Sequence, residues 1–175
     1  MGTYNCDHRL ALDDIGDPQR LKFKDKRYVL MRRSDSFPNC LPTDRVLPAL
    51  LADVPLQLEI DIKDEVQQYA ARVQRIRLLL LFRELTIADQ VEVRLNGEIL
   101  DCDNPLRAGD SAPSPPASWQ MYDLRNHLPQ VGKNEISIHL TKANEHFRRQ
   151  VPLEITDVEL EINYRFPNGQ WNDQR

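Results

Sequence analysis

The feature of this sequence that most constrains its fold is the recurrence of hydrophobic residues at every second position after residue 55. Between Leu56 and Ile62, aliphatic residues alternate with charged or amide residues, and the same alternation returns between Ile136 and Leu140. A period of two matches a β-strand with one buried face, whereas an amphipathic helix needs a period of about 3.6. The sequence therefore predicts half-buried antiparallel strands.

The segment 76–82 is apolar on both faces. Its even positions are all aliphatic or aromatic, and its odd face also carries Leu79 and Leu81. Such a strand lies in the middle of a sheet or beneath a covering segment. The stretch from Pro38 to Pro55, which contains four prolines, is a candidate cover, because proline confines a segment to an edge or linker position.

A turn signal fixes one hairpin. Asn96-Gly97 lies between two β-rich runs and predicts a type I′ turn, whose two central residues need φ above zero. A two-residue loop pairs Leu95 with Glu98 and Arg94 with Ile99. Val93 then shares the core face with Leu100.

The last expected strand contains a break in its alternation. Hydrophobic residues occupy odd positions at Leu153 and Ile155 but even positions from Val158 onward. Because a one-residue slip turns every later side chain to the other face, we expect a β-bulge or a sharp bend near Thr156-Asp157.

Together these segments predict an all-β chain, an antiparallel β-sandwich of seven to nine strands with a short helical and Pro-rich N-terminal extension. Twelve prolines against six glycines also disfavour a mostly helical protein. We expect an extension or interdomain linker over residues 1–24, with a short helix capped at Asp17-Pro18. The sandwich is expected over 25–166 and a polar tail over 167–175. A surface helical turn capped by Asp64 is expected between two strands.

Composition excludes several classes of protein. The formal net charge of −4 disfavours nucleic acid as a partner. The longest apolar run, Leu78–Phe82, is far shorter than the roughly 20 residues of a membrane span, so we expect no membrane partner. Cys6, Cys40 and Cys102 form no C-x-x-C pair, and free thiols favour the cytoplasm. The cellular compartment is left undecided, because a signal peptide could belong to a preceding part of a longer protein.

The titratable residues offer few catalytic arrangements. Most acids fall on the solvent-facing positions of strands and are expected to form a solvated face. These are Glu59, Asp61, Glu135, Glu159 and Glu161. Asp123 and His127 could form an Asp–His pair, but no Ser or Cys lies in a G-x-S-x-G context, and a surface loop accounts for His127 more simply. No phosphate-binding glycine loop occurs, so we expect no cofactor and no enzyme activity in this chain.

A long polar loop over residues 101–118 is the best place for a binding site, because structureless loops of this length are often functional. Asp101, Asp103 and Asn104 could hold a hard cation, but the pattern lacks the glycine and distal glutamate of an EF-hand, and a turn-forming cluster is favoured. Trp119 beside this loop could stack on a sugar ring, whereas Tyr122 is expected in the core. The candidate ligand-binding residues are Trp119, Asp103, Arg107 and His127.

Four segments resemble, in order, the galactose-binding-like jelly-roll domains that end many glycosidase-type proteins. They are V-E-V-R-L-N-G at 91–97, W-Q-M-Y-D-L at 119–124, V-G-K-N-E-I at 131–136 and I-T-D-V-E-L-E-I at 155–162. The stretch from Asp14 to Leu30 is similar to the link from a preceding TIM-barrel-like domain.

The resemblance implies a non-catalytic accessory module of a glycoside hydrolase-like protein, which is structural or binds carbohydrate weakly. Its expected partners are a carbohydrate and its own N-terminal catalytic domain. Two alternatives remain. One is a protein-interaction domain that uses the face of Leu79 and Leu81 either for self-association, as a homodimer, or to bind its parent enzyme. The other is a small hydrolase that uses Asp123 and His127.

Overall fold

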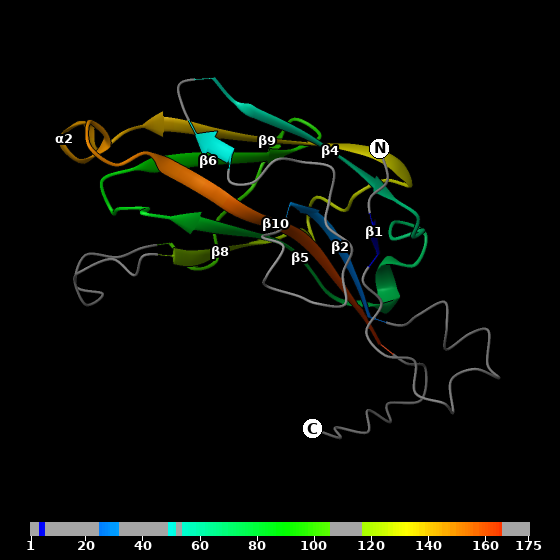
Figure 1. Ribbon diagram of the computed structural model, residues 1–175. Helices are drawn as coiled ribbons and strands as arrows, with labels where there is room; N and C mark the ends of the chain where they lie inside the picture. The colour runs from blue at the N-terminus through cyan, green and yellow to red at the C-terminus, as the bar shows by residue number, and fades with distance from the viewer. Residues whose placement is uncertain (1–3, 6–24, 32–48, 52–53, 106–116, 166–175) are drawn as a thin grey trace, which may run out of the picture.

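The structure is a computed structural model of the chain, and it describes residues 4–5, 25–31, 49–51, 54–105 and 117–165. These residues form two antiparallel β-sheets that lie against each other as two layers (Figure 1). The six-stranded sheet has the order β1-β2-β10-β5-β8, with β3 paired to the start of β10, and the four-stranded sheet has the order β4-β9-β6-β7. The predicted all-β sandwich is therefore confirmed.

The strands have the following bounds. The six-stranded sheet contains β1 (Tyr4–Asn5), β2 (Lys26–Met31), β3 (Ala49–Leu51), β5 (Val73–Arg83), β8 (Ala117–Asp123) and β10 (Leu153–Tyr164). The four-stranded sheet contains β4 (Leu56–Ile62), β6 (Gln90–Leu95), β7 (Glu98–Ile99) and β9 (Gly132–Lys142). A 3-10 helix, η2 (Ala70–Arg72), lies between β4 and β5, and a one-turn helix, α2 (Glu145–Arg148), lies between β9 and β10. Among the described residues there are thus ten strands, more than the predicted seven to nine, because β1, β3 and β7 are only two or three residues long.

Both predicted register features are present. On β5, Ile155 pairs with Phe82 and Asp157 with the next residue, Leu81, so Thr156 is an extra residue in β10 and forms the expected bulge. The predicted turn between β6 and β7 is also confirmed, with φ of 51° at Asn96 and 88° at Gly97.

The hydrophobic core fills the space between the layers. Strand β5 lies between β10 and β8, as its two apolar faces predicted, and its even residues from Ile76 to Phe82 are fully buried. The facing residues of β4, β6 and β9 close the core from the other sheet, and Val93 and Leu100 are both buried as expected. The part of the chain that the structure describes contains no helix long and apolar enough to cross a membrane.

The outer face of the six-stranded sheet corrects one expectation. Glu159 and Glu161 do not belong to a solvated face, because β10 is an interior strand with β2 and β5 on its two sides. Glu161 lies opposite Arg27 and Arg77 and is 3.5 Å and 3.2 Å from their guanidinium nitrogens, while Glu159 is 1% exposed and 3.4 Å from Arg27. By contrast, Glu59 and Glu135 on the outer face of the four-stranded sheet are exposed.

The same face bears on the predicted homodimer. Leu79 and Leu81 are half-buried, and the residues opposite them on β10, Glu159 and Asp157, are 1% and 2% exposed. A docking surface needs apolar area that is accessible to a partner. Because the two leucines are half-buried and their neighbours on β10 are buried, this face does not favour docking of a second copy. Self-association through this face stays a prediction.

The expected cap at Asp64 is wrong. Asp64 is buried, and its carboxylate accepts hydrogen bonds from the Lys26 ammonium group and the Tyr28 hydroxyl group of β2. A buried carboxylate needs such partners more than a solvent-exposed helical turn needs a cap, because an unpaired buried charge is very costly. The contact ties the β4–β5 connection to β2. The expected helix at Asp17-Pro18, Cys6 and Cys40, and the polar tail over 167–175 lie outside the described residues.

Candidate functional site

A pocket of about 230 Å³ opens at one end of the sandwich, which we call the loop end. At this end β5 finishes and β6 begins, β9 is joined to β10 through α2, and β8 starts (Figure 1, left). The pocket lies between the layers. Its described lining is Phe82, Leu85, Thr86, Ile87, Asp89, Gln90, Val91, Cys102, Pro105, Gln120 and Tyr122.

One wall of the pocket is built around Asp89 in the β5–β6 connection. Its carboxylate accepts hydrogen bonds from the Thr86 backbone N–H at 2.9 Å, the Thr86 hydroxyl at 2.7 Å and the Asn144 backbone N–H at 2.8 Å. The Asn144 side chain also donates to the Thr86 hydroxyl at 3.2 Å. A side chain from the β9–β10 connection is thereby joined to the β5–β6 connection.

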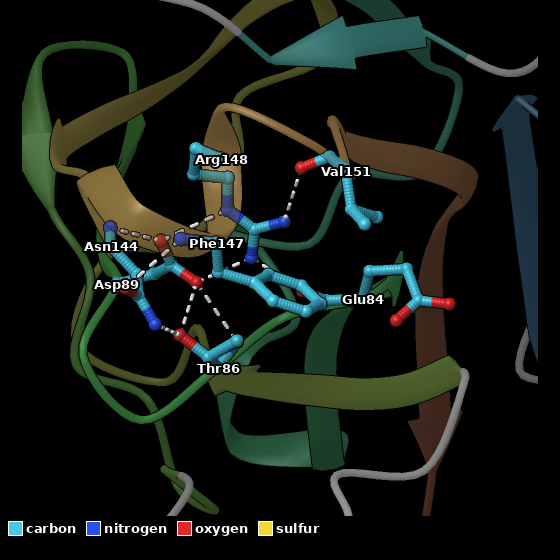
Figure 2. Close-up of polar contacts among 7 residues, drawn as sticks. All are labelled: Glu84, Thr86, Asp89, Asn144, Phe147, Arg148 and Val151. Carbon is cyan, nitrogen blue, oxygen red and sulfur yellow. Dashed lines mark hydrogen bonds and ion pairs between the residues drawn. The ribbon is translucent and has the colours of Figure 1, made fainter.

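Arg148 of α2 completes this network (Figure 2). Its Nε donates to Asp89 at 3.1 Å and its Nη2 also binds that carboxylate, while Nη1 donates to the Val151 carbonyl at 3.2 Å. Nη2 further donates to the carbonyl of Glu84, a residue with φ of 62° in the left-handed region that costs a non-glycine residue about 1–2 kcal/mol. The Asp89 side chain is 0% exposed and that of Arg148 is 10% exposed, so this is a buried, multiply bonded ion pair.

The environment of Asp89 predicts how stability depends on pH. Burial alone would raise the pKa of Asp89, but the hydrogen bonds from Arg148, Asn144 and Thr86 outweigh it and hold the pKa below its ordinary value of 3.8. A depressed folded-state pKa contributes stability that is present above about pH 4 and is lost as the pH falls through the folded value. We therefore expect the stability gap between the natural chain and Asp89→Asn to be constant near neutral pH and to shrink in acid.

Urea unfolding of the two proteins between pH 7 and pH 2 measures this gap. Other carboxylates contribute equally to both proteins and cancel in the difference. A gap that stays constant down to pH 2, or that widens in acid, would contradict the assignment of Asp89 as an ionised, paired group.

The opposite wall is formed by the inward side of β8 and by the segment that pairs with it. Cys102 forms an isolated β-bridge with Tyr122, and its thiol donates to Oε1 of Gln120 at 2.8 Å. Burial raises the pKa of the Cys102 thiol, and burial together with the Cys102 contact raises the pKa of Tyr122. A thiol with a raised pKa is a poor nucleophile at neutral pH.

The predicted residues Trp119 and Asp103 lie along the same edge of β8, Trp119 near its start and Asp103 opposite Met121. Trp119 is 38% exposed, and the Asp103 backbone N–H donates to the carbonyl of Met121 at 2.7 Å. Asn104 binds the same edge, because its side-chain amide contacts the Trp119 carbonyl and the Met121 N–H at 2.8 Å and 2.7 Å. The D-x-D-N cluster thus covers the exposed edge of β8, which protects a sheet from pairing with other chains.

His127 does not join them. It lies in the connection after β8, at the opposite end of this strand from Ala117. The Asp123 carboxylate accepts hydrogen bonds from the Arg125 backbone N–H at 2.8 Å and from its guanidinium group at 2.7 Å. The Asp–His hydrolase stays a prediction that this arrangement does not favour. Arg107 lies outside the described residues.

The sequence analysis did not predict the contacts of Asp89 and Gln120, although a sequence pattern points to each of these residues. Thr86 and Asp89 have the [ST]-x-x-[DE] spacing that often marks side-chain bonding to a local backbone. Gln120 lies on the inward side of β8 together with Tyr122, which is buried in the core as expected. Arg148, the partner of Asp89, is 59 residues away and had no local signal.

No protein-family model matches the chain, and no curated protein matches it. Among the described residues, no three His, Cys, Asp or Glu side chains are grouped so that they could hold a metal ion.

Proposed function

We propose that this chain is a non-catalytic, galactose-binding-like β-sandwich module that accompanies a glycoside hydrolase-like domain and binds carbohydrate weakly at the outer side of its loop end. The observation that carries this proposal is the exposed Trp119 near the start of β8; Asp103 pairs through its backbone with Met121, two residues further along the same strand. An exposed aromatic ring offers a flat apolar surface with low entropy cost, and a carboxylate on the same strand edge can accept hydrogen bonds from sugar hydroxyl groups.

The state of the other reactive groups supports a binding role over a catalytic one. A general acid or base needs a proton that can move at the working pH and a place within reach of substrate. Asp89 is fixed by Arg148, Asp123 is bound to Arg125, and the Cys102 thiol has a raised pKa. The jelly-roll connection and the partnership with a catalytic domain remain parts of the proposal that rest on the resemblance.

Tryptophan fluorescence tests the sugar site directly. The chain contains only Trp119 and Trp171, so a Trp171→Phe background leaves Trp119 as the single reporter. We expect galactose, glucose, mannose or lactose to change its emission saturably, with a Kd of roughly 1 mM or weaker, which corresponds to about −4 kcal/mol. Calorimetry on the natural chain should then show at least a ~10-fold weaker affinity in Trp119→Ala.

Ile99→Ala is the matched control, because Ile99 is another exposed hydrophobic residue but lies on β7 of the other sheet. It should leave the affinity unchanged. The absence of saturable binding by every sugar, or an equal loss in both variants, would remove carbohydrate binding from the proposal and leave a structural module.

A further inference from the structure

We propose that the pocket on the inner side of β8 is a separate binding site for a small uncharged molecule that has one hydrogen-bond acceptor and a compact apolar body. The pocket and the proposed sugar site lie on opposite faces of β8, because Gln120 and Tyr122 point inward while Trp119 points outward. The pocket is therefore a second site, distinct from the proposed sugar site.

The first step of the argument is the side chain of Gln120. This residue is only 5% exposed and lines the pocket, and its Oε1 accepts from the Cys102 thiol. Among the described residues no group accepts a hydrogen bond from its Nε2, and this nitrogen is not one of the fully buried side-chain atoms that lack a partner, so it is accessible from the pocket. The pocket thus contains a donor that a ligand oxygen can satisfy.

The second step concerns charge. The only carboxylate in the described lining is that of Asp89, which is neutralised by Arg148 and accepts three further hydrogen bonds. A charged ligand would lose its hydration without gaining a free counter-ion, which is unfavourable inside a protein. An uncharged ligand avoids this cost.

The third step concerns shape. Phe82, Leu85, Val91 and Pro105 provide apolar walls, and Ile87 at 57% exposure lies between the pocket and solvent. The volume of about 230 Å³ is below the roughly 300–1,000 Å³ of pockets for drug-sized ligands. The occupant is therefore a small compact molecule in which one oxygen faces Gln120 and the remainder contacts these walls.

Nuclear magnetic resonance titration of the full chain tests the site with two probes of similar shape. Cyclohexanone has a carbonyl acceptor and an apolar ring, whereas cyclohexylammonium has the same ring with a positive charge and no acceptor. We expect cyclohexanone to shift the Gln120 side-chain amide signals and the backbone amides of Leu85 and Val91 saturably. Cyclohexylammonium should produce no saturable shift of these signals.

Gln120→Leu keeps the size of the side chain and removes the donor, and it should weaken cyclohexanone binding by roughly 10-fold. Gln57→Leu, at an exposed position of β4, is the control and should leave the affinity unchanged. No saturable shift with cyclohexanone, equal binding of both probes, or an unchanged affinity in Gln120→Leu would overturn the proposal and leave the pocket to water.

The sugar experiment and this one fail independently. Loss of sugar binding in Trp119→Ala has no bearing on the Gln120 amide signals, because the two side chains lie on opposite faces of β8. Cyclohexanone binding in Trp119→Ala should equal that of the natural chain, and a loss there would show that the probe reports on the outer face and would also overturn the pocket proposal.

Discussion

Replacement of Arg148 by methionine is expected to lower the free energy of unfolding by about 3–5 kcal/mol, the usual cost of removing one partner from a buried ion pair. Methionine retains most of the aliphatic volume but leaves the fully buried Asp89 carboxylate without its counter-ion. The Glu84 and Val151 carbonyls also lose their donor. Since small domains have only about 5–15 kcal/mol of stability, the effect should be plain in urea.

Arg149→Met is the matched control, because Arg149 is the next residue and its side chain is exposed. It should change stability by less than about 0.5 kcal/mol. The double variant Asp89→Asn/Arg148→Met should be more stable than the sum of the single losses predicts, since it leaves no unpaired charge. Equal effects of Arg148→Met and Arg149→Met would show that the ion pair contributes nothing to stability.

Features that depend on neighbours in sequence could be predicted, because local backbone geometry determines them. The turn at Asn96-Gly97 needs two residues with positive φ, and few other dipeptides supply them. The bulge at Thr156 follows from the alternation alone, since the inward positions before and after it have opposite parity. The central place of β5 followed in the same way from its two apolar faces.

Features that depend on which strands are neighbours could not be predicted. The parity of β10 correctly placed Glu159 and Glu161 on the outer face, but parity does not say that β2 and β5 bring Arg27 and Arg77 beside them. Asp64 was predicted to be a helix cap from its neighbours in sequence. Its actual partner, Tyr28, is 36 residues away and could not be identified from those neighbours. Whether a charged residue on a strand is solvated or paired depends on which strands are its neighbours in the sheet. The alternation of hydrophobic residues along one strand does not reveal the strand order.

The candidate site shows the same difference between features that depend on local sequence and features that depend on the fold. Trp119 and Asp103 were predicted from the loop beside them, and both lie along β8, with Trp119 near its start and Asp103 opposite Met121. His127 was grouped with them, yet it follows the other end of β8 from Ala117, since a strand carries its two connections to opposite ends of the sheet. The pocket could not be foreseen, because its described lining comes from three stretches of chain, 82–91, 102–105 and 120–122, that meet only in the folded sandwich.

The extra residue in β10 leads to the sharpest test of the fold, a pair of single-residue deletions with opposite expected results. Removing Thr156 should be tolerated, because the remaining residues of β10 then alternate without a break and keep their pairing with β5. Its cost should be about 1–2 kcal/mol, which includes the contact of the Thr156 hydroxyl with the Leu81 carbonyl and the loss of the local twist at the bulge.

Removing Glu159, three residues further on, should abolish cooperative folding. If the bulge is kept, Leu160, Ile162 and Tyr164 turn outward, which loses roughly 1.5–3 kcal/mol for each apolar side chain, and Glu161 turns into the core. If the bulge is lost instead, Asp157 turns inward and Val158 outward. Either route buries a carboxylate without a partner, at several kcal/mol, so the total approaches the whole stability of a domain.

Glu159→Gln separates register from charge, because it weakens the contact with Arg27 but shifts no residue. Thermal unfolding followed by circular dichroism should show a cooperative transition for Glu159→Gln and for the Thr156 deletion, and none for the Glu159 deletion. A cooperative transition in both deletion variants would mean that strand β10 can change its register along β5. The inward alternation of its side chains would then not be what fixes the sandwich.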